Sequence, residues 1–452
     1  MQVSLDLTNH TQSFQLGHSG DVTCLAVSPD GLLIATGEVS RRPCILVWRA
    51  DTGDVVQTLS GFHKRAITAL SFSPDGLGLA SLGCDDDHSI AVYDWDNRLL
   101  KATAKGGRRK ALAVAWNGSG TRMVTCGLRH VSFWAPSGRN LSHCRGVFGG
   151  KGRKQTLPCC AFMGDTAVVG TGDGHLYLFE NGSTALTRSV KAHTGSVYTL
   201  YSVNGSAGSD SSSGGDGQAG VWSGGKDGLV KFYNKQVYGV KEFSVATIAS
   251  NGAAGGAAGA LKALAASAAA VGGGGGVAGP GGRGGGGKKR PGAGGSSVSL
   301  DPAVRSLFAS KDGSRLLIGT RGGELYEMST ADGSDARGAG LGGGGGGPGP
   351  LTAGHGRGQV WGLSAHPKER LYATCGDDGS VRIWSLDDRR VVGSISTDCS
   401  CRALCYSPDG ASLAVGCGGG KGKADASKSG TFLVLKSENL ALRHEGKVRV
   451  YS

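Results

Sequence analysis

Short runs of alternating apolar and polar residues recur along the chain, the first three about 45 residues apart. Alternation with a period of two predicts strands that bury one face, so each run is expected to be the first strand of a repeated unit. The eight runs are Val22–Ser28, Ile67–Ser73, Leu112–Asn117, Leu157–Phe162, Val197–Ser202, Val304–Ala309, Val360–Ala365 and Cys401–Ser407.

Each unit continues with a turn and further strands. A Pro–Asp–Gly turn follows the first strand at Pro29–Gly31, Pro74–Gly76 and Pro408–Gly410, with a relative at His366–Lys368. A second strand then ends in small residues, as in Ile34–Gly37, and a third ends in an aromatic, as in Leu46–Trp48. One small sheet cannot bury both faces without neighbours, so the repeats predict the blades of an all-β propeller.

Polar residues at fixed places in the units identify the type of repeat. In the seventh unit, His355 precedes Trp384 by 29 residues, with Thr374 and Asp378 between them. The first unit has His18 and Trp48, 30 residues apart, and the second has His63 and Tyr93, also 30 apart. The fifth has His193 and Asp227 but is stretched by the Ser/Gly-rich insert at 205–220. This arrangement resembles the WD-repeat family, in which such residues form a hydrogen-bonded tetrad across one blade. A buried Asp–His pair needs a partner for every donor and acceptor, which explains why the residues recur together.

These histidines could instead be metal ligands or catalytic bases. Because His18, His63, His193 and His355 belong to four different units, each with its own partners, they are not expected to converge on one site. The chain also shows no nucleophile elbow, no zinc-ligand spacing and no carboxylate pair outside the repeat turns. We therefore expect a non-enzyme with no cofactor and no metal.

The units predict the domain organisation. Residues 18–396 are expected to form a β-propeller of seven blades, and 1–17 the residual strands of a preceding blade. Residues 397–452 would hold an eighth unit, either in the ring or starting a second propeller, and a fragment of a ninth. Gly-rich segments at 205–220, 251–298 and 331–350 are expected to be inserts, because glycine loses the most backbone entropy on ordering.

Composition narrows the class of protein. Glycine makes up 83 of the 452 residues, and the chain has neither an 18-residue apolar run nor an N-terminal export signal. Its twelve cysteines contain no Cys-x-x-Cys pair and fall mostly in strand-like runs. Cys399 and Cys401 could form a redox pair, but buried and reduced cysteines are the favoured interpretation.

The net charge of +13 comes from one region of the chain. Residues 97–164 carry 13 basic and no acidic residues, while the remaining 35 of the 48 basic residues match the 35 acidic ones. Loops that enter neighbouring blades of a propeller emerge on the same rim, so the second, third and fourth units are expected to present one basic arc. The arc comprises Lys64, Arg65, Lys105, Arg108, Arg109, Lys110, Lys151, Arg153 and Lys154. It should attract an acidic partner.

Longer stretches resemble the echinoderm microtubule-associated protein-like family. The nearest is Val124–Phe162, where a Cys–Gly–x–x–His–x–x–Phe–Trp core is followed by Arg–Gly–Val–Phe–Gly; His18–Gly37, Val360–Leu386 and Leu404–Gly416 also match. The resemblance implies a cytoplasmic, cytoskeletal protein whose propellers bind tubulin, with a cilium or flagellum as another place for it. By this resemblance, this sequence is expected to lack the family's amino-terminal coiled coil, its basic microtubule-binding region, most of the hydrophobic motif before the first blade and nearly all of its second propeller.

Two functions follow as hypotheses. The first is a propeller that binds tubulin or microtubules, and the second is a generic WD-repeat scaffold of another assembly, for example a ciliary or ubiquitin-ligase complex. Other proteins would bind through the propeller faces. Nucleic acid is not expected as a partner, because the basic loops lack interleaved aromatic residues, and neither is a membrane.

Overall fold

The computed structural model describes residues 17–203, 219–246, 302–310, 312–334, 354–355, 359–386, 391–397, 399–418 and 430–447. They divide between two compact units, Met1–Glu242 with Ala303–Gly313 and Phe243–Pro302 with Ser314–Ser452. No helix among the described residues has the length and apolar character needed to cross a membrane.

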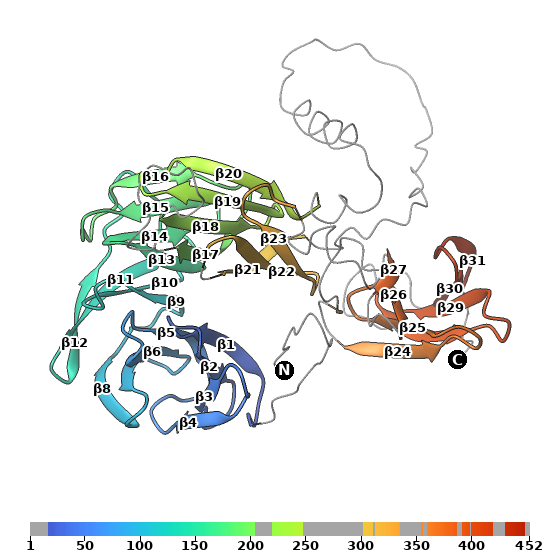
Figure 1. Ribbon diagram of the computed structural model, residues 1–452, viewed down its shortest axis with the longest axis horizontal. Coiled ribbons are helices and arrows are strands. Elements are labelled where there is room, and N and C mark those ends of the chain that lie inside the picture. Colours follow the sequence, from blue (N-terminus) through green and yellow to red (C-terminus); the bar gives the residue numbers. More distant parts are fainter. Residues whose placement is uncertain are drawn as a thin grey trace, which may run out of the picture. The chain divides into compact units, whose positions relative to one another are not determined.

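The first unit contains five blades, each a meander of four antiparallel strands, and the first strand of a sixth. Figure 1 shows these blades following one another from blue to yellow-green. Blade one comprises β1 Val22–Val27, β2 Leu33–Glu38, β3 Ile45–Arg49 and β4 Val55–Leu59, and blade two β5 Ile67–Phe72, β6 Gly78–Gly83, β7 Ile90–Asp94 and β8 Leu99–Ala104. Blade three comprises β9 Ala111–Trp116, β10 Met123–Gly127, β11 His130–Ser137 and β12 Asn140–Arg145. Blade four comprises β13 Cys159–Met163, β14 Thr166–Gly170, β15 His175–Phe179 and β16 Arg188–Lys191. Blade five comprises β17 Val197–Val203, β18 Gly220–Gly225, β19 Leu229–Asn234 and β20 Gly239–Ser244, and β21 Val304–Ala309 opens blade six.

The second unit carries the rest of the described strands. Of blade six it holds β22 Arg315–Thr320 and β23 Leu325–Ser329, which pair antiparallel. Blade seven comprises β24 Val360–Ala365, β25 Leu371–Gly376, β26 Ser380–Ser385 and β27 Val391–Ser396. Blade eight comprises β28 Cys401–Tyr406, β29 Ser412–Cys417, β30 Thr431–Lys436 and β31 Leu442–Lys447.

The apolar core lies between consecutive blades. Cys160 and Phe162 of β13 face a cluster shared with blade three, whereas Cys159 and Ala161 of the same strand face a cluster shared with blade five. Alternate residues of one strand thus bury opposite faces of the sheet, which is why an isolated blade would leave half of its apolar side chains in water. The predicted all-β propeller fold is confirmed.

Blades two and three are joined more closely than their neighbours. Thr103 of β8 pairs in parallel with Asn140 of β12, and the Thr103 N–H donates to the Arg139 carbonyl at 3.1 Å. The two blades therefore form one eight-stranded sheet, β5-β6-β7-β8-β12-β11-β10-β9.

The ends of the chain limit what the structure says of the predicted domains. The residual blade expected before residue 18 lies outside the described residues, apart from Gly17, and so do the centres of the three Gly-rich inserts. Leu442–Lys447 pairs with β30 as the fourth strand of blade eight, while the residues after Lys447, expected in a ninth unit, lie outside the described part. The division into domains stays a prediction.

Candidate functional site

The tetrad residues of blade seven lie in one hydrogen-bonded chain. His355 Nδ1 lies 3.0 Å from Asp378 Oδ1, and His355 Nε2 lies 2.9 Å from Thr374 Oγ1. Trp384 Nε1 donates to Thr374 Oγ1 at 2.7 Å. Since a carboxylate only accepts, His355 donates from Nδ1 and accepts the Thr374 hydroxyl proton at Nε2. The chain links the loop before β24 to β25 and β26, so it fixes one blade.

Blade five repeats this chain with a serine in the middle position. His193 Nδ1 lies 2.9 Å from Asp227 Oδ1, and its Nε2 lies 2.8 Å from Ser223 Oγ. Burial alone would raise the pKa of Asp227, but hydrogen bonds from His193 and from the Thr194 and Leu229 N–H groups lower it to about 2. Burial opposes a similar set of hydrogen bonds at Asp378, whose pKa is also lowered to about 2.

Blade one uses a glutamate instead of an aspartate. His18 lies 3.1 Å from Glu38 Oε2 through Nδ1 and 2.7 Å from Thr36 Oγ1 through Nε2, and Trp48 Nε1 donates to the same hydroxyl at 2.6 Å. Glu38 is the last residue of β2, whereas the aspartates of blades five and seven lie in the turn after the second strand. Glu38 was not predicted as a tetrad residue because the repeat pattern places the acidic residue in that turn.

Blade two replaces the direct acid contact with a serine. His63 Nε2 lies 2.6 Å from Ser81 Oγ, and its Nδ1 lies 3.0 Å from Ser89 Oγ. Ser89 in turn donates to Asp85. Burial lowers the pKa of His63 to about 4, so this histidine is neutral at physiological pH.

One cluster comes nearest to a metal-ligand set within the described ranges. Ligand atoms of His18, Glu38 and Cys44 all lie within 4.8 Å of one another. The Glu38 carboxylate, however, already accepts from the Ser19 and Gly20 N–H groups at 2.7 and 3.3 Å and from the His18 ring. The cluster is accounted for by its hydrogen bonds, and the tetrads support the scaffold.

The predicted basic loops and the turns between second and third strands form one continuous band on the first unit. The Ser40 N–H donates to Arg65 O at 3.0 Å, the Gly107 N–H to Asp87 O at 2.8 Å, and the Leu128 N–H to Lys110 O at 2.9 Å. The Arg129 N–H then donates to Gln155 O at 2.9 Å. Each bond joins a loop that enters a blade to such a turn, so blades one to four share this edge.

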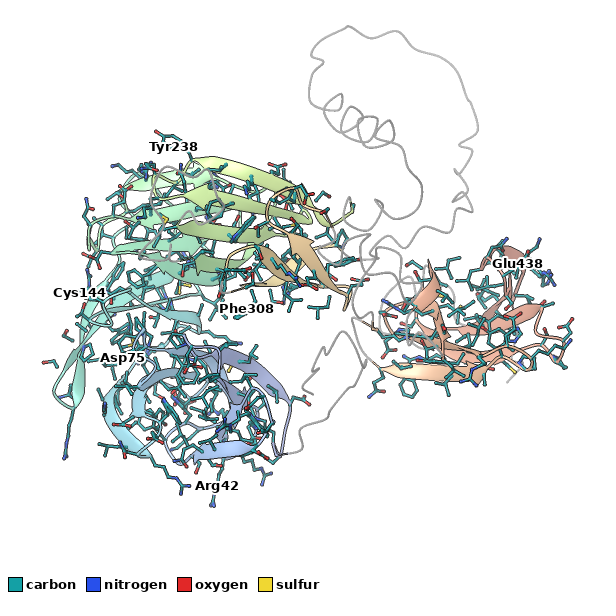
Figure 2. The ribbon with its side chains drawn as sticks, in the orientation of Figure 1. Arg42, Asp75, Cys144, Tyr238, Phe308 and Glu438 are labelled. Carbon is teal, nitrogen blue, oxygen red and sulfur yellow. The ribbon has the colours of Figure 1, made fainter. Side chains whose placement is uncertain are left out.

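We call the exposed cations of this band the basic face. It holds eight of the nine predicted arc residues and three that the sequence analysis missed: Arg41, Arg42, Lys64, Arg65, Lys105, Arg108, Arg109, Lys110, Arg129, Arg153 and Lys154. Arg42 projects outward from the first blade (Figure 2). The three additions lie in turns between second and third strands, whereas the arc was predicted from the loops that enter the blades.

Lys151 lies elsewhere. Its ammonium group donates to the Thr187 carbonyl at 3.0 Å, in the loop that joins β15 and β16. The neighbouring Val147 forms a parallel bridge with Ala185 of that loop. Residues 147–151 therefore lie along the third-to-fourth-strand loop of blade four, apart from the rest of the predicted arc.

Part of the basic face is paired with acidic residues that lie outside the acid-free region 97–164. Arg65 Nη2 lies 2.8 Å from Asp86 Oδ1, and Lys105 Nζ lies 3.0 Å from Asp87 Oδ2. Both aspartates belong to the turn between β6 and β7, which precedes the acid-free region in sequence and folds against it. Within the described residues, no ion pair within 4 Å involves Arg108, Arg109, Lys110, Arg129, Arg153 or Lys154. The excess of positive charge is therefore centred on blades three and four.

Comparison with known proteins places the chain in a family. Residues 11–254 match the echinoderm microtubule-associated protein first beta-propeller, and residues 349–385 match the WD domain, G-beta repeat. Echinoderm microtubule-associated protein-like 2 of Mus musculus is 26% identical over 419 residues, covering 90% of this chain and 52% of the relative. The 77 kDa echinoderm microtubule-associated protein of Strongylocentrotus purpuratus is 25% identical, covering 93% of this chain and 51% of the relative.

A longer relative gives the same result. Echinoderm microtubule-associated protein-like 4 of Homo sapiens is 23% identical over 461 residues, covering 96% of this chain and 38% of the relative. The chain thus spans about half the length, or less, of these relatives. Because the family model matches more than half of the chain and the structure has WD-type blades, the chain belongs to the echinoderm microtubule-associated protein-like family of WD-repeat propellers.

Proposed function

We propose that this chain is a cytoskeletal, non-enzymatic protein that binds tubulin or microtubules through the basic face of its first unit. The observation that carries the proposal is the continuous band of exposed cations on blades one to four. Tubulin is acidic, so a surface with an excess of positive charge is complementary to it and would raise the rate of encounter.

The build of the basic face supports this role. The Leu128 and Arg129 N–H groups anchor the β10–β11 turn to the loops on both sides of it at 2.9 Å. In addition, the guanidinium of Arg109 donates to the Arg129 carbonyl at 3.1 Å. These bonds hold the backbone of the face in place before a partner arrives, which reduces the ordering entropy that binding must overcome.

Co-sedimentation with polymerised tubulin at low and moderate salt tests the proposal. The test variant is R108E/K154E, because neither side chain has a hydrogen bond or ion pair in the described structure. The control is R139E/K235E, which makes the same change in charge at exposed residues of third-to-fourth-strand turns.

We expect R108E/K154E to remain in the supernatant, whereas R139E/K235E should sediment with polymerised tubulin. Binding of the unaltered chain should weaken as the salt concentration rises. Equal loss in both variants would show a dependence on net charge alone. Binding that neither variant changes would remove the basic face from the account.

A further inference from the structure

Four buried cysteines gather in the second unit, where blades seven and eight meet. Cys375 lies in β25, Cys399 precedes β28, Cys401 begins β28, and Cys417 ends β29. All four belong to one apolar cluster with Tyr406, and all are reduced. Nothing in the tetrads or the basic face uses these thiols.

The strand register places two of the four directly opposite each other. Cys401 of β28 pairs with Cys417 of β29. The Gly418 N–H donates to the Ser400 carbonyl at 2.9 Å on one side of the pair, and on its other side the register shifts between Cys401 and Ala403, so the pair lies at the edge of a β-bulge. The bond beyond the pair is the pattern of a non-hydrogen-bonded pair, in which the Cα atoms are about 4.5 Å apart and both side chains lie on the same face. This separation falls at the short end of the range that a disulfide spans.

We propose that Cys401 and Cys417 form a reversible disulfide when the protein meets hydrogen peroxide. A disulfide at the short end of the allowed range is strained and therefore easily reduced, which suits a reversible modification better than a permanent cross-link.

The surroundings give the two sulfurs different roles. Cys401 is fully buried and Cys417 is 7 % exposed, so only a small oxidant can reach the pair. Hydrogen bonds from the Cys375 and Cys417 thiols, outweighing burial, lower the pKa of Cys401, whereas the hydrogen bond to Cys401 and burial raise the pKa of Cys417. Thr397 Oγ1 also lies 3.3 Å from the Cys401 sulfur. The thiolate is the nucleophile, so Cys401 attacks the oxidant, and Cys417, which lies opposite it, is the resolving residue.

The chemistry balances in two steps. The Cys401 thiolate attacks one oxygen of the peroxide, the O–O bond breaks, and one water leaves with the proton that Cys401 gave up, as a sulfenic acid forms on Cys401. The Cys417 sulfur then attacks the Cys401 sulfur, the S–S bond forms, the S–O bond breaks, and the second water leaves with the Cys417 proton. Two thiols are oxidised by two electrons, and one peroxide is reduced to two waters.

The other pairings are less suited to a bond. Cys399 and Cys401 are two residues apart, and the Cys401 thiol is directed to the Cys399 carbonyl at 3.8 Å. Cys375 pairs with Gly362 across its own sheet and meets Cys401 only across the blade boundary. The register therefore favours Cys417 over the Cys-x-Cys partner that the sequence offered.

Peptide mapping of the full chain after peroxide treatment tests the proposal. Trypsin cleaves after Arg402 and separates Cys401 from Cys417, so only a disulfide holds the two peptides together without reductant. Fragment ions of the linked peptides identify the joined cysteines in the unaltered chain, even if a variant does not fold. C401S and C417S should each abolish the link, dithiothreitol should reverse it, and the control C405S, at an exposed position of β28, should keep it.

Three results would overturn the proposal. One is a link that joins Cys399, Cys405 or Cys375 in place of Cys401 or Cys417. Another is a link that survives in C401S. The third is an unaltered chain in which exposed Cys144 is oxidised while Cys401 and Cys417 remain thiols.

Discussion

The four tetrad histidines differ in the groups that their ring nitrogens face. His193 and His355 face carboxylates directly, at 2.9 and 3.0 Å, whereas His63 faces two serine hydroxyls and is 3.8 Å from the nearest Asp85 oxygen. The charged form of His63 is therefore poorly compensated. The tetrad of blade two should therefore make stability depend on pH in mild acid.

The low pKa of His63 predicts a loss of stability in mild acid. In the unfolded chain a histidine titrates near pH 6.5, but in the folded chain burial lowers the pKa of His63 to about 4. Between these values only the unfolded state takes up the proton, so the free energy of unfolding falls as pH drops from about 6.5 to 4, by about 3 kcal/mol at most. Denaturant unfolding of the chain and of H63Q at several pH values checks this, and identical pH slopes for both would contradict it.

The hydroxyl group of Thr374, which bonds to two other tetrad residues, should contribute measurably to the free energy of unfolding. Replacing Thr374 by valine keeps the shape but leaves Trp384 Nε1 and His355 Nε2 without their shared partner. We expect T374V to lower the free energy of unfolding by about 1–3 kcal/mol. T58V, at an exposed threonine of β4, should change it by less than about 0.5 kcal/mol in the same urea titration. Equal effects would show that the tetrad contributes nothing particular.

The turns between first and second strands are formed by hydrogen bonds among residues that are close together in the sequence. In the β5–β6 turn, Ser73 donates to Asp75, the Leu77 N–H donates to Asp75 Oδ1 at 3.0 Å, and the Gly78 N–H donates to Ser73 Oγ at 2.7 Å. The same pattern recurs at Ser28 and Asp30. The Pro–Asp–Gly motif predicted these turns because proline fixes φ, aspartate accepts a hydrogen bond from the backbone two residues on, and glycine accepts a positive φ.

The glycine of this turn provides a test of backbone conformation alone. Gly76 has a φ of 74°, and an added Cβ would meet only Pro29 Cδ at 3.9 Å. Space is available, so G76A should destabilise the chain through the left-handed backbone, by about 1 kcal/mol. G118A, where a Cβ would meet nothing within 4 Å and φ is not positive, is the matched control and should be neutral or slightly stabilising. Thermal melts of both variants in parallel would contradict this explanation if they shifted equally.

The sequence could predict features that depend on residues close together in the chain, but not those that depend on tertiary contacts. The small residues that end the second strands were recognised, but their reason is tertiary: a Cβ on Gly83 would come within 2.3 Å of His63 Nδ1, and one on Gly225 equally close to His193 Nδ1. Glu38 was not predicted because it lies at the end of a strand, whereas the acidic residue that contacts the histidine was expected in the turn after that strand. The neutralising Asp86 was missed because charge was counted along the chain, whereas Arg65 meets it across a fold of the backbone.

The whole molecule combines repeated blades with one uneven property, the surface charge. Blades one, two, five and seven carry the tetrad or a variant of it, and apolar clusters lie between consecutive blades, so these features explain the fold but no specificity. The charge, in contrast, is centred on the loops of blades three and four, beside the eight-stranded sheet that joins blades two and three. The count of charged residues along the chain assigns the imbalance to residues 97–164, whereas the placement of Lys151 needed the structure.

The affinity of the chain for unpolymerised tubulin tests the central claim most directly. Equilibrium binding of labelled tubulin dimers should be weakened at least tenfold in R108E/K154E, while R139E/K235E should bind like the unaltered chain. A tenfold loss corresponds to about 1.4 kcal/mol, a modest demand on two charges at a complementary surface. Tubulin binding that is the same in all three proteins, or none in the unaltered chain at low salt, would contradict the account.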